Sequence, residues 1–332
     1  MRRFAWQRVM VSAGISLMAV ALTPFIFANT VFGQEDLQAL AFGWPIPFVQ
    51  QQSVLTPPAD WFPQRLTMLN PWENPTDVLW GRFGLSVASV GIFLLLGFSL
   101  LSQFSCRVRR AGLIVALGFI LLLAVSGYHI LGIAGLWPGG GFWQARIEVP
   151  LMVSAVDHNG NGRPDALDIV QGARAEVERG TIYDSSYYPD YPPEGRGACT
   201  DVIWRALSWA GYDLKAMVNG DIHVHPGAYG ETGENPDSNI DFRRVRNLQI
   251  FFLRHGQSLT TELLPGDVEN LIQWQAGDIV VFGAPCEHIG VISDRRRADG
   301  VPFLIHNAGP RAAEADCLLR WPSPIIYHFR WP

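Results

Sequence analysis

The chain has 332 residues, of which 48% are hydrophobic and only 17% are charged, and it contains 12 tryptophans. This composition is too apolar for an ordinary soluble protein and indicates attachment to a membrane. The net charge of −5 argues against nucleic acid as a partner, because proteins that bind nucleic acid carry a basic surface.

Three long apolar runs explain this composition, and each approaches or exceeds the roughly 20 residues that a helix needs to cross a bilayer. We assign residues 1–28, 83–104 and 111–136 to three transmembrane helices. The first run begins with basic residues, as a cleaved signal peptide does. Its apolar stretch is long for that role, so we interpret it as an uncleaved anchor.

Arginines determine the predicted orientation. Three lie at the start of the first run and three fill the turn between the second and third, whereas the intervening loop, residues 29–82, holds only two. Because positive charge is retained on the cytoplasmic side, the N-terminus and that turn are expected in the cytoplasm. The prediction is a multi-pass protein of an inner or plasma membrane whose C-terminal domain is extracytoplasmic.

The extracytoplasmic loop 29–82 is rich in proline and tryptophan. Its tryptophans are expected either to rest at the interface of the lipid bilayer, where aromatic rings gather, or to form a docking surface for membrane-protein partners. The sequence leaves both interpretations open.

The next segment, residues 137–180, is a linker with a calcium-type loop at 157–168. Oxygen-bearing side chains occupy loop positions 1, 3, 5, 9 and 12, and a glycine stands at position 6. This is the ligand spacing of a twelve-residue calcium loop, in which position 7 contributes its carbonyl oxygen. The predicted ligands are Asp157, Asn159, Asn161, Arg163, Asp165 and Asp168.

Two features depart from the EF-hand pattern. Position 12 is aspartate in place of glutamate, and residues 149–156 look more like a strand than an entering helix. The loop therefore resembles the dockerin-type variant, which ends in aspartate, while the alternative is an Asn-Gly-rich turn that binds nothing. We expect calcium with a structural role, no metal catalysis and no organic cofactor.

Residues 181–332 form one domain with an α+β pattern, in which a helix packs on a small antiparallel sheet. A helix is predicted at 198–210, followed by a long loop at 213–241 and a further segment at 245–255. Short β-like runs then follow, because β-rich residues alternate with turn residues. They are residues 278–282, 288–293, 303–306 and 325–329.

Cys199 lies at the start of the first of these helices. Prolines and glycines precede it, and the apolar residues after it recur at helical spacing. The unpaired N–H groups and the positive dipole end of a helix start favour a thiolate over a thiol. Cys199 is therefore a candidate nucleophile if a histidine can reach it, although a buried structural cysteine is the common alternative.

A hairpin supplies the histidine. The second and third β-like runs are joined by a loop with its turn at 298–300, and a pairing centred near Arg297–Ala298 places His288 opposite His306 or Asn307. Side chains opposite one another share a face and lie within contact distance. Such a pair is how a general base acquires the residue that orients it.

Several segments together resemble known bacterial proteins. They look like the NlpC-type papain-like cell-wall peptidases and, more closely, a bacterial family catalogued as domain of unknown function 1287. The resemblance covers residues 180–330 or so and departs at Phe242, where histidine is expected. The matching segments are residues 197–202, 239–249, 275–282, 288–296 and 305–307.

The resemblance implies a papain-like domain that hydrolyses an amide bond in peptidoglycan or a related cell-wall peptide. It implies Cys199 as nucleophile, His288 as general base and His306 as the orienting residue, with Asn307 as the alternative. A tyrosine upstream of the cysteine, Tyr187 or its neighbour, is expected to place a hydroxyl in the oxyanion hole or to serve only in packing.

Other interpretations remain. A catalytically inactive domain could serve as a binding or structural subunit of a membrane complex. Zinc could bind His223 and His225, on one strand face, with His288 or Cys286, although a fourth ligand lacks convincing spacing.

A disulfide between Cys286 and Cys317 is permitted outside the cytoplasm. Asp201 is expected to pair with one of two arginines, Arg243 or Arg244.

Overall fold

The structure is a computed structural model that describes residues 2–53, 61–69, 71, 74–101, 118, 147–284 and 286–331. The chain forms two compact units, Met1–Tyr128 and His129–Pro332. The third predicted membrane span, residues 111–136, lies outside the described residues except for residue 118.

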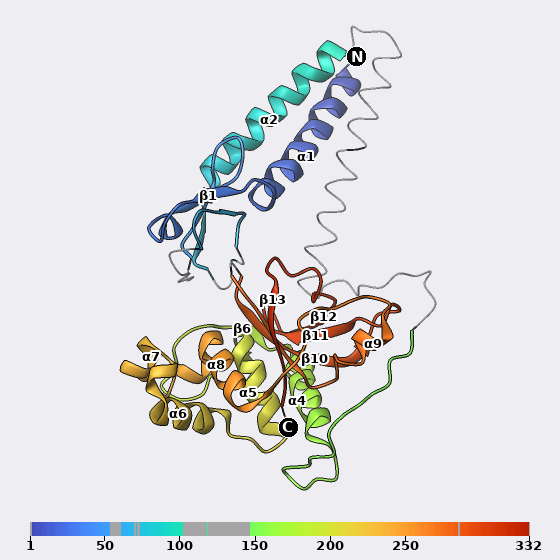
Figure 1. Ribbon diagram of the computed structural model, residues 1–332. Helices are drawn as coiled ribbons and strands as arrows, with labels where there is room; N and C mark the ends of the chain where they lie inside the picture. The colour runs from blue at the N-terminus through green and yellow to red at the C-terminus, as the bar shows by residue number, and fades with distance from the viewer. Residues whose placement is uncertain are drawn as a thin grey trace. The chain divides into compact units, whose positions relative to one another are not determined.

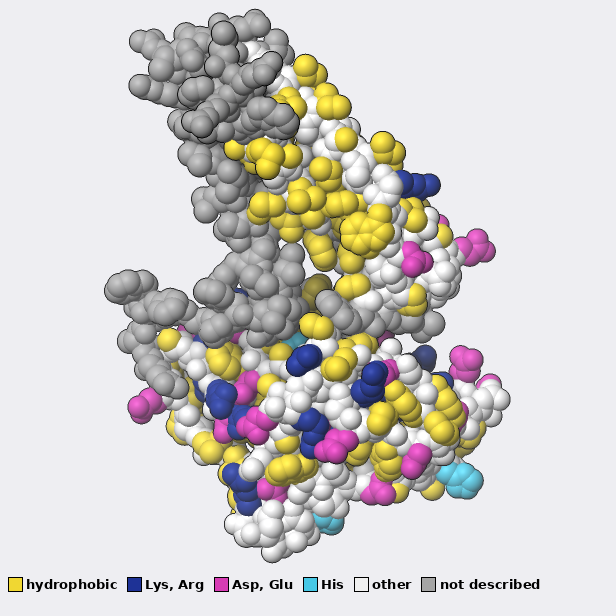
Figure 2. Space-filling view, turned by 180° about the vertical axis from the view of Figure 1, so that it is seen from behind, with side chains coloured by type: hydrophobic (Ala, Val, Ile, Leu, Met, Phe, Trp, Pro, Cys, Tyr) yellow, Lys and Arg dark blue, Asp and Glu magenta, His cyan; other side chains and the backbone are white. Residues whose placement is uncertain are grey.

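Two long helices dominate the first unit. Helices α1 (Arg2–Ile26) and α2 (Trp80–Leu101) pack side by side (Figure 1). In the described part of the chain these two are long and apolar enough to cross a membrane. Hydrophobic side chains cover their visible surface (Figure 2), and small polar ones such as Ser16 and Ser86 are buried. The helices fit a membrane anchor or, for α1, a signal sequence.

Short strands occupy the region between these helices, which the sequence predicts as a loop. Strand β1 (Asn29–Val31) pairs with β4 (Gln64–Leu66), and β3 (Val49–Gln51) lies between β2 (Leu40–Phe42) and β5 (Thr76–Val78). A 3-10 turn, η1 (Asp36–Gln38), adds a buried leucine to the apolar side chains of the strands. This region is therefore a small folded layer with its own core.

An antiparallel sheet organises the second unit. Its strand order is β12-β11-β10-β9-β13-β8. The four predicted runs are confirmed as β9, β10, β11 and β13, whereas β8 and β12 were not foreseen. The strands are β8 (Gln257–Ser258), β9 (Ile279–Phe282), β10 (His288–Arg296), β11 (Pro302–His306), β12 (Ala313–Ala315) and β13 (Ile325–Arg330).

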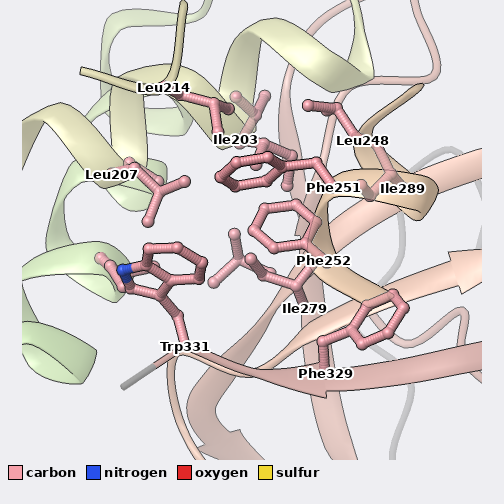
Figure 3. Close-up of a cluster of buried hydrophobic side chains, with 14 of the residues drawn as sticks. Ile203, Leu207, Leu214, Leu248, Phe251, Phe252, Ile279, Ile289, Phe329 and Trp331 are labelled. Atoms are coloured by element: carbon pink, nitrogen blue, oxygen red, sulfur yellow. The ribbon is translucent and has the colours of Figure 1, made fainter. Parts of the chain in front are cut away.

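Helices cover one face of this sheet (Figure 1). Figure 3 shows the apolar layer between them, in which Leu207 and Phe252 from the helices meet Ile279 and Phe329 from the strands. The helix predicted around Cys199 is confirmed. The main helices are α4 (Asp165–Arg179), α5 (Cys199–Trp209), α6 (Leu214–Val224) and α8 (Val245–His255).

The long loop predicted at 213–241 is wrong, because helix α6 occupies its first part. The side chain of Asp213 accepts a hydrogen bond from the backbone N–H of Ala216, which begins the helix. Leu214, Val218 and Ile222 then recur at a spacing of four and are buried. Two 3-10 turns, η3 (Pro226–Ala228) and η4 (Asp241–Arg243), and the short helix α7 (Glu231–Glu234) follow.

A second apolar cluster packs on the opposite face of the sheet. It includes Trp274, Leu304, Cys317 and Trp321, together with residues of the short helix α9 (Val268–Leu271). Both faces of the sheet are thus buried, and the mixed α+β architecture is confirmed. The papain-like fold stays a prediction.

The hairpin register differs from the predicted one. Val291 faces Ile305 and Ile292 faces Leu304, and a β-bulge between Ile292 and Arg296 shifts the pairing toward the turn. In this register His306 lies opposite Gly290, two residues from His288. The two histidines are therefore diagonal neighbours on one face rather than directly opposed.

The chain enters the second unit as an extended segment, although the strand predicted at 149–156 does not form. The backbone N–H of Ile147 donates to the carbonyl of Ala298 over 2.8 Å. The Gln275 side chain accepts from the N–H of Met152 over 2.9 Å and donates to the carbonyl of Pro150 over 3.1 Å.

Candidate functional site

Glycine is required immediately before α5. A Cβ on Gly197 would lie 2.6 Å from the Cβ of Asp201, closer than real Cβ atoms approach. This close approach lets the Asp201 carboxylate accept a hydrogen bond of 2.6 Å from the N–H of Ala198. The carboxylate thereby binds a donor just before the helix begins at Cys199.

A buried ion pair holds Asp201 in place. Arg243 contacts both of its carboxylate oxygens, with Nε at 2.8 Å from Oδ1 and Nη2 at 2.9 Å from Oδ2. The expected pairing is confirmed for Arg243, whereas Arg244 lies 3.4 Å from Asp241. The guanidinium balances the Asp201 charge, so the helix start beside Cys199 does not face an uncompensated carboxylate.

Cys199 is a thiol in the first turn of α5. A nucleophile that meets a substrate is expected to be partly exposed, but the exposed fraction of Cys199 is only 5%. The reason is that Cys199 belongs to the apolar cluster under the helices, with Val202 and Ile305.

Two imidazole rings form the centre of the candidate site. His288 Nε2 lies 2.9 Å from His306 Nδ1, and the ring planes are nearly perpendicular, at 89°. Both side chains are buried, and Trp321 stacks on the His288 ring at 4.3 Å between centroids. The predicted pairing of His288 with His306 is present.

Cys317 extends this pair into a chain of three groups, which sequence reasoning missed. Its Sγ lies 3.6 Å from Nε2 of His306, within hydrogen-bonding distance for sulfur. Burial raises the pKa of the Cys317 thiol, and the nearby carboxylate of Asp316 adds to this effect. Cys317 is thus a protonated thiol at neutral pH. Cys286 and Cys317 are not joined in the disulfide that the sequence permits.

Burial keeps both histidines neutral. It lowers the pKa of His288 to about 3, because a charged ring would lose its hydration. Burial also lowers the pKa of His306 well below its usual value, and the neighbouring His288 contributes to the same effect. At neutral pH each ring therefore has one nitrogen that donates and one that accepts.

Asn307 connects the histidines to the start of α5. Its amide donates to the carbonyl of Gly197 over 2.8 Å and to that of Thr181 over 3.3 Å. The end of β11 is thereby fastened to the chain two residues before Cys199. Asn307 was the alternative residue to orient His288, but its side-chain amide donates to Gly197 and Thr181 instead.

The candidate residues lie on two faces of the sheet. Side chains alternate along a strand, so His288 and His306 share the face of Ile292 and Leu304, in the second apolar cluster. Cys199 packs in the first cluster, under the helices. A hydrogen bond between Cys199 and His288 stays a prediction.

The upstream tyrosines bind carboxylates. Tyr187 is 55% exposed, and its hydroxyl donates to Asp237 over 3.0 Å. Tyr188 donates to Asp184 over 2.7 Å, which raises the pKa of the phenol. Either hydroxyl would have to leave its carboxylate to serve an oxyanion hole.

Comparison with known proteins gives the family. A model of a domain of unknown function (DUF1287) matches residues 170–331. The uncharacterized protein YijF of Escherichia coli (strain K12) is 38% identical over 192 residues, covering 55% of this chain and 87% of that protein. The chain belongs to the DUF1287 family. The DUF1287 match contains both Cys199 and the paired histidines, while a link to NlpC-type peptidases stays a prediction.

The calcium-type loop lies before the residues of the DUF1287 match. Asp157 accepts hydrogen bonds from the N–H groups of Asn161 and Gly162, at 3.0 and 2.7 Å. The amides of Asn159 and Asn161 both point at one oxygen of Asp168. Asp165 accepts from the N–H of His158 and from the hydroxyl of Tyr212, and the Arg163 N–H donates to Asn161.

The zinc interpretation fails at its first step, because His223 lies on helix α6 and His225 caps it, so no strand face aligns them. Among the described residues, no group of three or more histidine, cysteine and acidic side chains is placed to hold a metal ion. The calcium-type loop would bind its ion partly through asparagine and backbone oxygens, which are ligands of another kind.

Proposed function

We propose that the DUF1287 domain of this chain is an extracytoplasmic, papain-like cysteine hydrolase that cleaves an amide bond of peptidoglycan or a related cell-wall peptide. The observation that carries the proposal is the bond from Asn307 to Gly197. It joins the residue after His306 to the carbonyl two residues before Cys199.

In the proposed reaction, the Cys199 sulfur attacks the amide carbonyl carbon as His288 takes the thiol proton. The backbone N–H of Cys199 donates to the oxyanion. The tetrahedral intermediate collapses, the leaving amine takes the proton from His288, and a thioester remains. Water then attacks the thioester with His288 as base, releasing the carboxylic acid and restoring the thiol.

The chain of hydrogen bonds is compatible with the tautomer that this reaction needs. If His288 is to accept a proton at Nδ1, its Nε2 must carry hydrogen and donate it to Nδ1 of His306. His306 then carries its own hydrogen on Nε2, which points at the Cys317 sulfur. His306 is thus the proposed orienting residue, and the face of Trp321 stabilises the positive charge on His288 during the reaction.

A catalytically inactive binding subunit is the competing proposal, and the low exposure of Cys199 favours it. A hydrolase requires a displacement that admits the substrate carbonyl and brings Cys199 and His288, which pack on opposite faces of the sheet, within hydrogen-bonding distance. A binding subunit requires none.

Cleavage by the full-length chain in detergent micelles separates the two proposals. Purified peptidoglycan fragments are incubated with it, and mass spectrometry detects new amine and acid termini. We expect Cys199→Ala and His288→Ala to abolish cleavage, and Cys286→Ala, which changes a half-buried thiol outside the histidine chain, to retain it. Binding without cleavage in the wild type would support the inactive subunit.

We also propose that three helices span the membrane and that the DUF1287 domain lies outside the cytoplasm. The arginine distribution supports this topology. A reporter that is active only in the cytoplasm, fused after Pro332, should be silent, and a strong signal would refute the topology.

For the loop at 157–168 we propose structural calcium. The support is the ligand spacing of the loop, together with the hydrogen bonds that Asp157 accepts from the N–H groups at loop positions 5 and 6. Calcium should raise the melting temperature of the wild type but not of the Asp157→Ala/Asp168→Ala variant. The control is Asp190→Ala, whose carboxylate is 75% exposed, and equal melting of the wild type with calcium and with chelator would exclude the site.

A further inference from the structure

A pocket of about 240 Å³ lies where α5 ends and α6 begins. We propose that it binds one sugar ring of a cell-wall glycan, which would place the saccharide part of the substrate against this end of α5. This inference rests on the proposed function and deepens it. The pocket is lined by Tyr191, Trp204, Ser208, Gly211, Tyr212, Asp213, Leu214 and Lys215.

Aromatic faces form one wall. The rings of Tyr191 and Trp204 lie 4.6 Å apart, and the buried ring of Phe242 supports both from behind, at 5.5 and 6.4 Å. Tyr191 is 38% exposed, and Lys215 covers one face of its ring, so a ligand would contact the part of the ring that stays exposed. The negative face of an aromatic ring attracts the polarised C–H bonds on the apolar face of a pyranose.

Charged and hydroxyl groups supply the polar part of the pocket. Asp213 offers a carboxylate near the Tyr191 hydroxyl, at 3.4 Å, and Ser208 offers an exposed hydroxyl. The Lys215 ammonium lies 4.7 Å from the centre of the Tyr191 ring and 2.8 Å from Asp190. Because a cation already occupies this ring face and carboxylates balance it, the pocket favours a neutral hydroxylated ligand over a charged one.

The size of the pocket limits the ligand to one ring. Sites for drug-sized molecules enclose roughly 300–1,000 Å³, and this pocket is smaller. A longer glycan would therefore place one residue in the pocket and continue along the surface.

The pocket is connected to the proposed nucleophile through α5. Trp204 follows Cys199 by five residues, about 7.5 Å along the helix axis at 1.5 Å per residue. Its Nε1 donates to Asp201 over 2.9 Å, the same carboxylate that binds the backbone N–H before Cys199. Because five residues also turn the helix by about 140°, the peptide attached to a sugar at Trp204 would have to pass around the start of α5 to meet Cys199.

The calcium-type loop supports the other wall. His158 stacks on Tyr212 at 4.3 Å, and Gly211 approaches the loop so closely that a Cβ there would lie 3.1 Å from that of Asn159. Ordering of this loop would therefore order the pocket.

Binding is measured with full-length Cys199→Ser protein in detergent micelles, so that cleavage does not interfere. A soluble N-acetylglucosamine tetramer is titrated, and tryptophan fluorescence and calorimetry report the affinity. We expect saturable binding that Tyr191→Ala and Trp204→Ala weaken by about tenfold or more. Ser208→Trp, which fills the pocket mouth from an exposed position, should also weaken it.

The matched control is Trp209→Ala on the same helix. Trp209 is 46% exposed and lies outside the pocket, so its removal should leave the affinity unchanged. The subsite is refuted if the tetramer does not bind, or if Trp209→Ala weakens binding as much as Tyr191→Ala does. Binding is independent of cleavage: saccharide binding without hydrolysis would refute the hydrolase alone, and hydrolysis without saccharide binding would refute the subsite alone.

Discussion

The two faces of the sheet in the second unit differ in what they bury. The face under the helices meets an apolar cluster, in which Ile289, Val291 and Ile305 contact α5. The opposite face buries two imidazoles and a thiol among tryptophan and leucine. An apolar layer needs only shape, whereas buried polar groups cost free energy unless each finds a partner. Both faces therefore bury apolar side chains, and the second face also holds a hydrogen-bonded chain of polar groups.

Truncation on the helix face should have the largest effect on stability. Ile305→Ala removes a fully buried side chain and should lower the free energy of unfolding by about 3 kcal/mol. Because no titrating group is involved, the loss should be equal at pH 7 and pH 5. Urea unfolding followed by near-ultraviolet circular dichroism measures both values, and a loss that changes with pH would contradict the assignment of the two faces.

Breaking the connection between the faces should have the next largest effect. Asn307→Leu leaves the carbonyls of Gly197 and Thr181 without this donor and should cost about 2 kcal/mol. If the domain is the proposed hydrolase, cleavage should fall by a larger factor than the folded fraction does, because the end of β11 loses its link to the chain before α5. Asn219→Leu, which removes an exposed contact to Ser238, is the control. Unchanged cleavage in folded Asn307→Leu would remove the main support for the proposed site.

Acid should act through the histidine face. The pKa of His288 is lowered from its unfolded value to about 3, so the unfolded state binds the extra proton between those values. The contribution of the neutral His288 ring to the free energy of unfolding is complete above about pH 6.5. It decreases by about 1.4 kcal/mol per pH unit as the pH falls toward 3. At pH 5 the loss should be about 2 kcal/mol. Urea midpoints of the wild type and of His288→Leu/His306→Leu should diverge accordingly, and parallel pH profiles would show that the rings are not buried as neutral groups.

The smallest effect is expected at Cys317. Replacement by serine keeps a hydrogen-bonding group beside His306 and should change stability by about 1 kcal/mol or less, whereas alanine removes the contact. Nitrogen NMR of the imidazoles reports the tautomer directly. We expect alanine to mix the two tautomers of His306 and serine to retain one, and identical spectra for both variants would show that Cys317 has no influence on the pair.

Local patterns predicted much of this fold. Helix α5 and strands β9, β10, β11 and β13 were foreseen because their apolar spacing and turn residues agree. Helix α6 was missed although Leu214, Val218 and Ile222 have helical spacing, since the surrounding polar and glycine residues suggested a loop. The β-bulge after Ile292 shifted the register by an amount that no local pattern indicated.

The candidate site was predictable only in part. The His288–His306 pair follows from a hairpin, which is a local structure. The place of Cys317 depends on how an irregular segment folds back over the sheet, and the roles of Asn307 and Trp321 depend on contacts between distant segments. Burial of Cys199 likewise results from tertiary packing, which the helix pattern alone does not specify.

The extended segment at the entrance of the second unit has a mechanical consequence. Its bonds to Ala298 and to the Gln275 side chain come before α4 in the chain. Tension applied from the N-terminal side would load these bonds first, and they would have to rupture before any pull reached α4 or α5. Rupture of the Gln275 bonds would thus absorb tension on the segment before the interior of the domain is deformed.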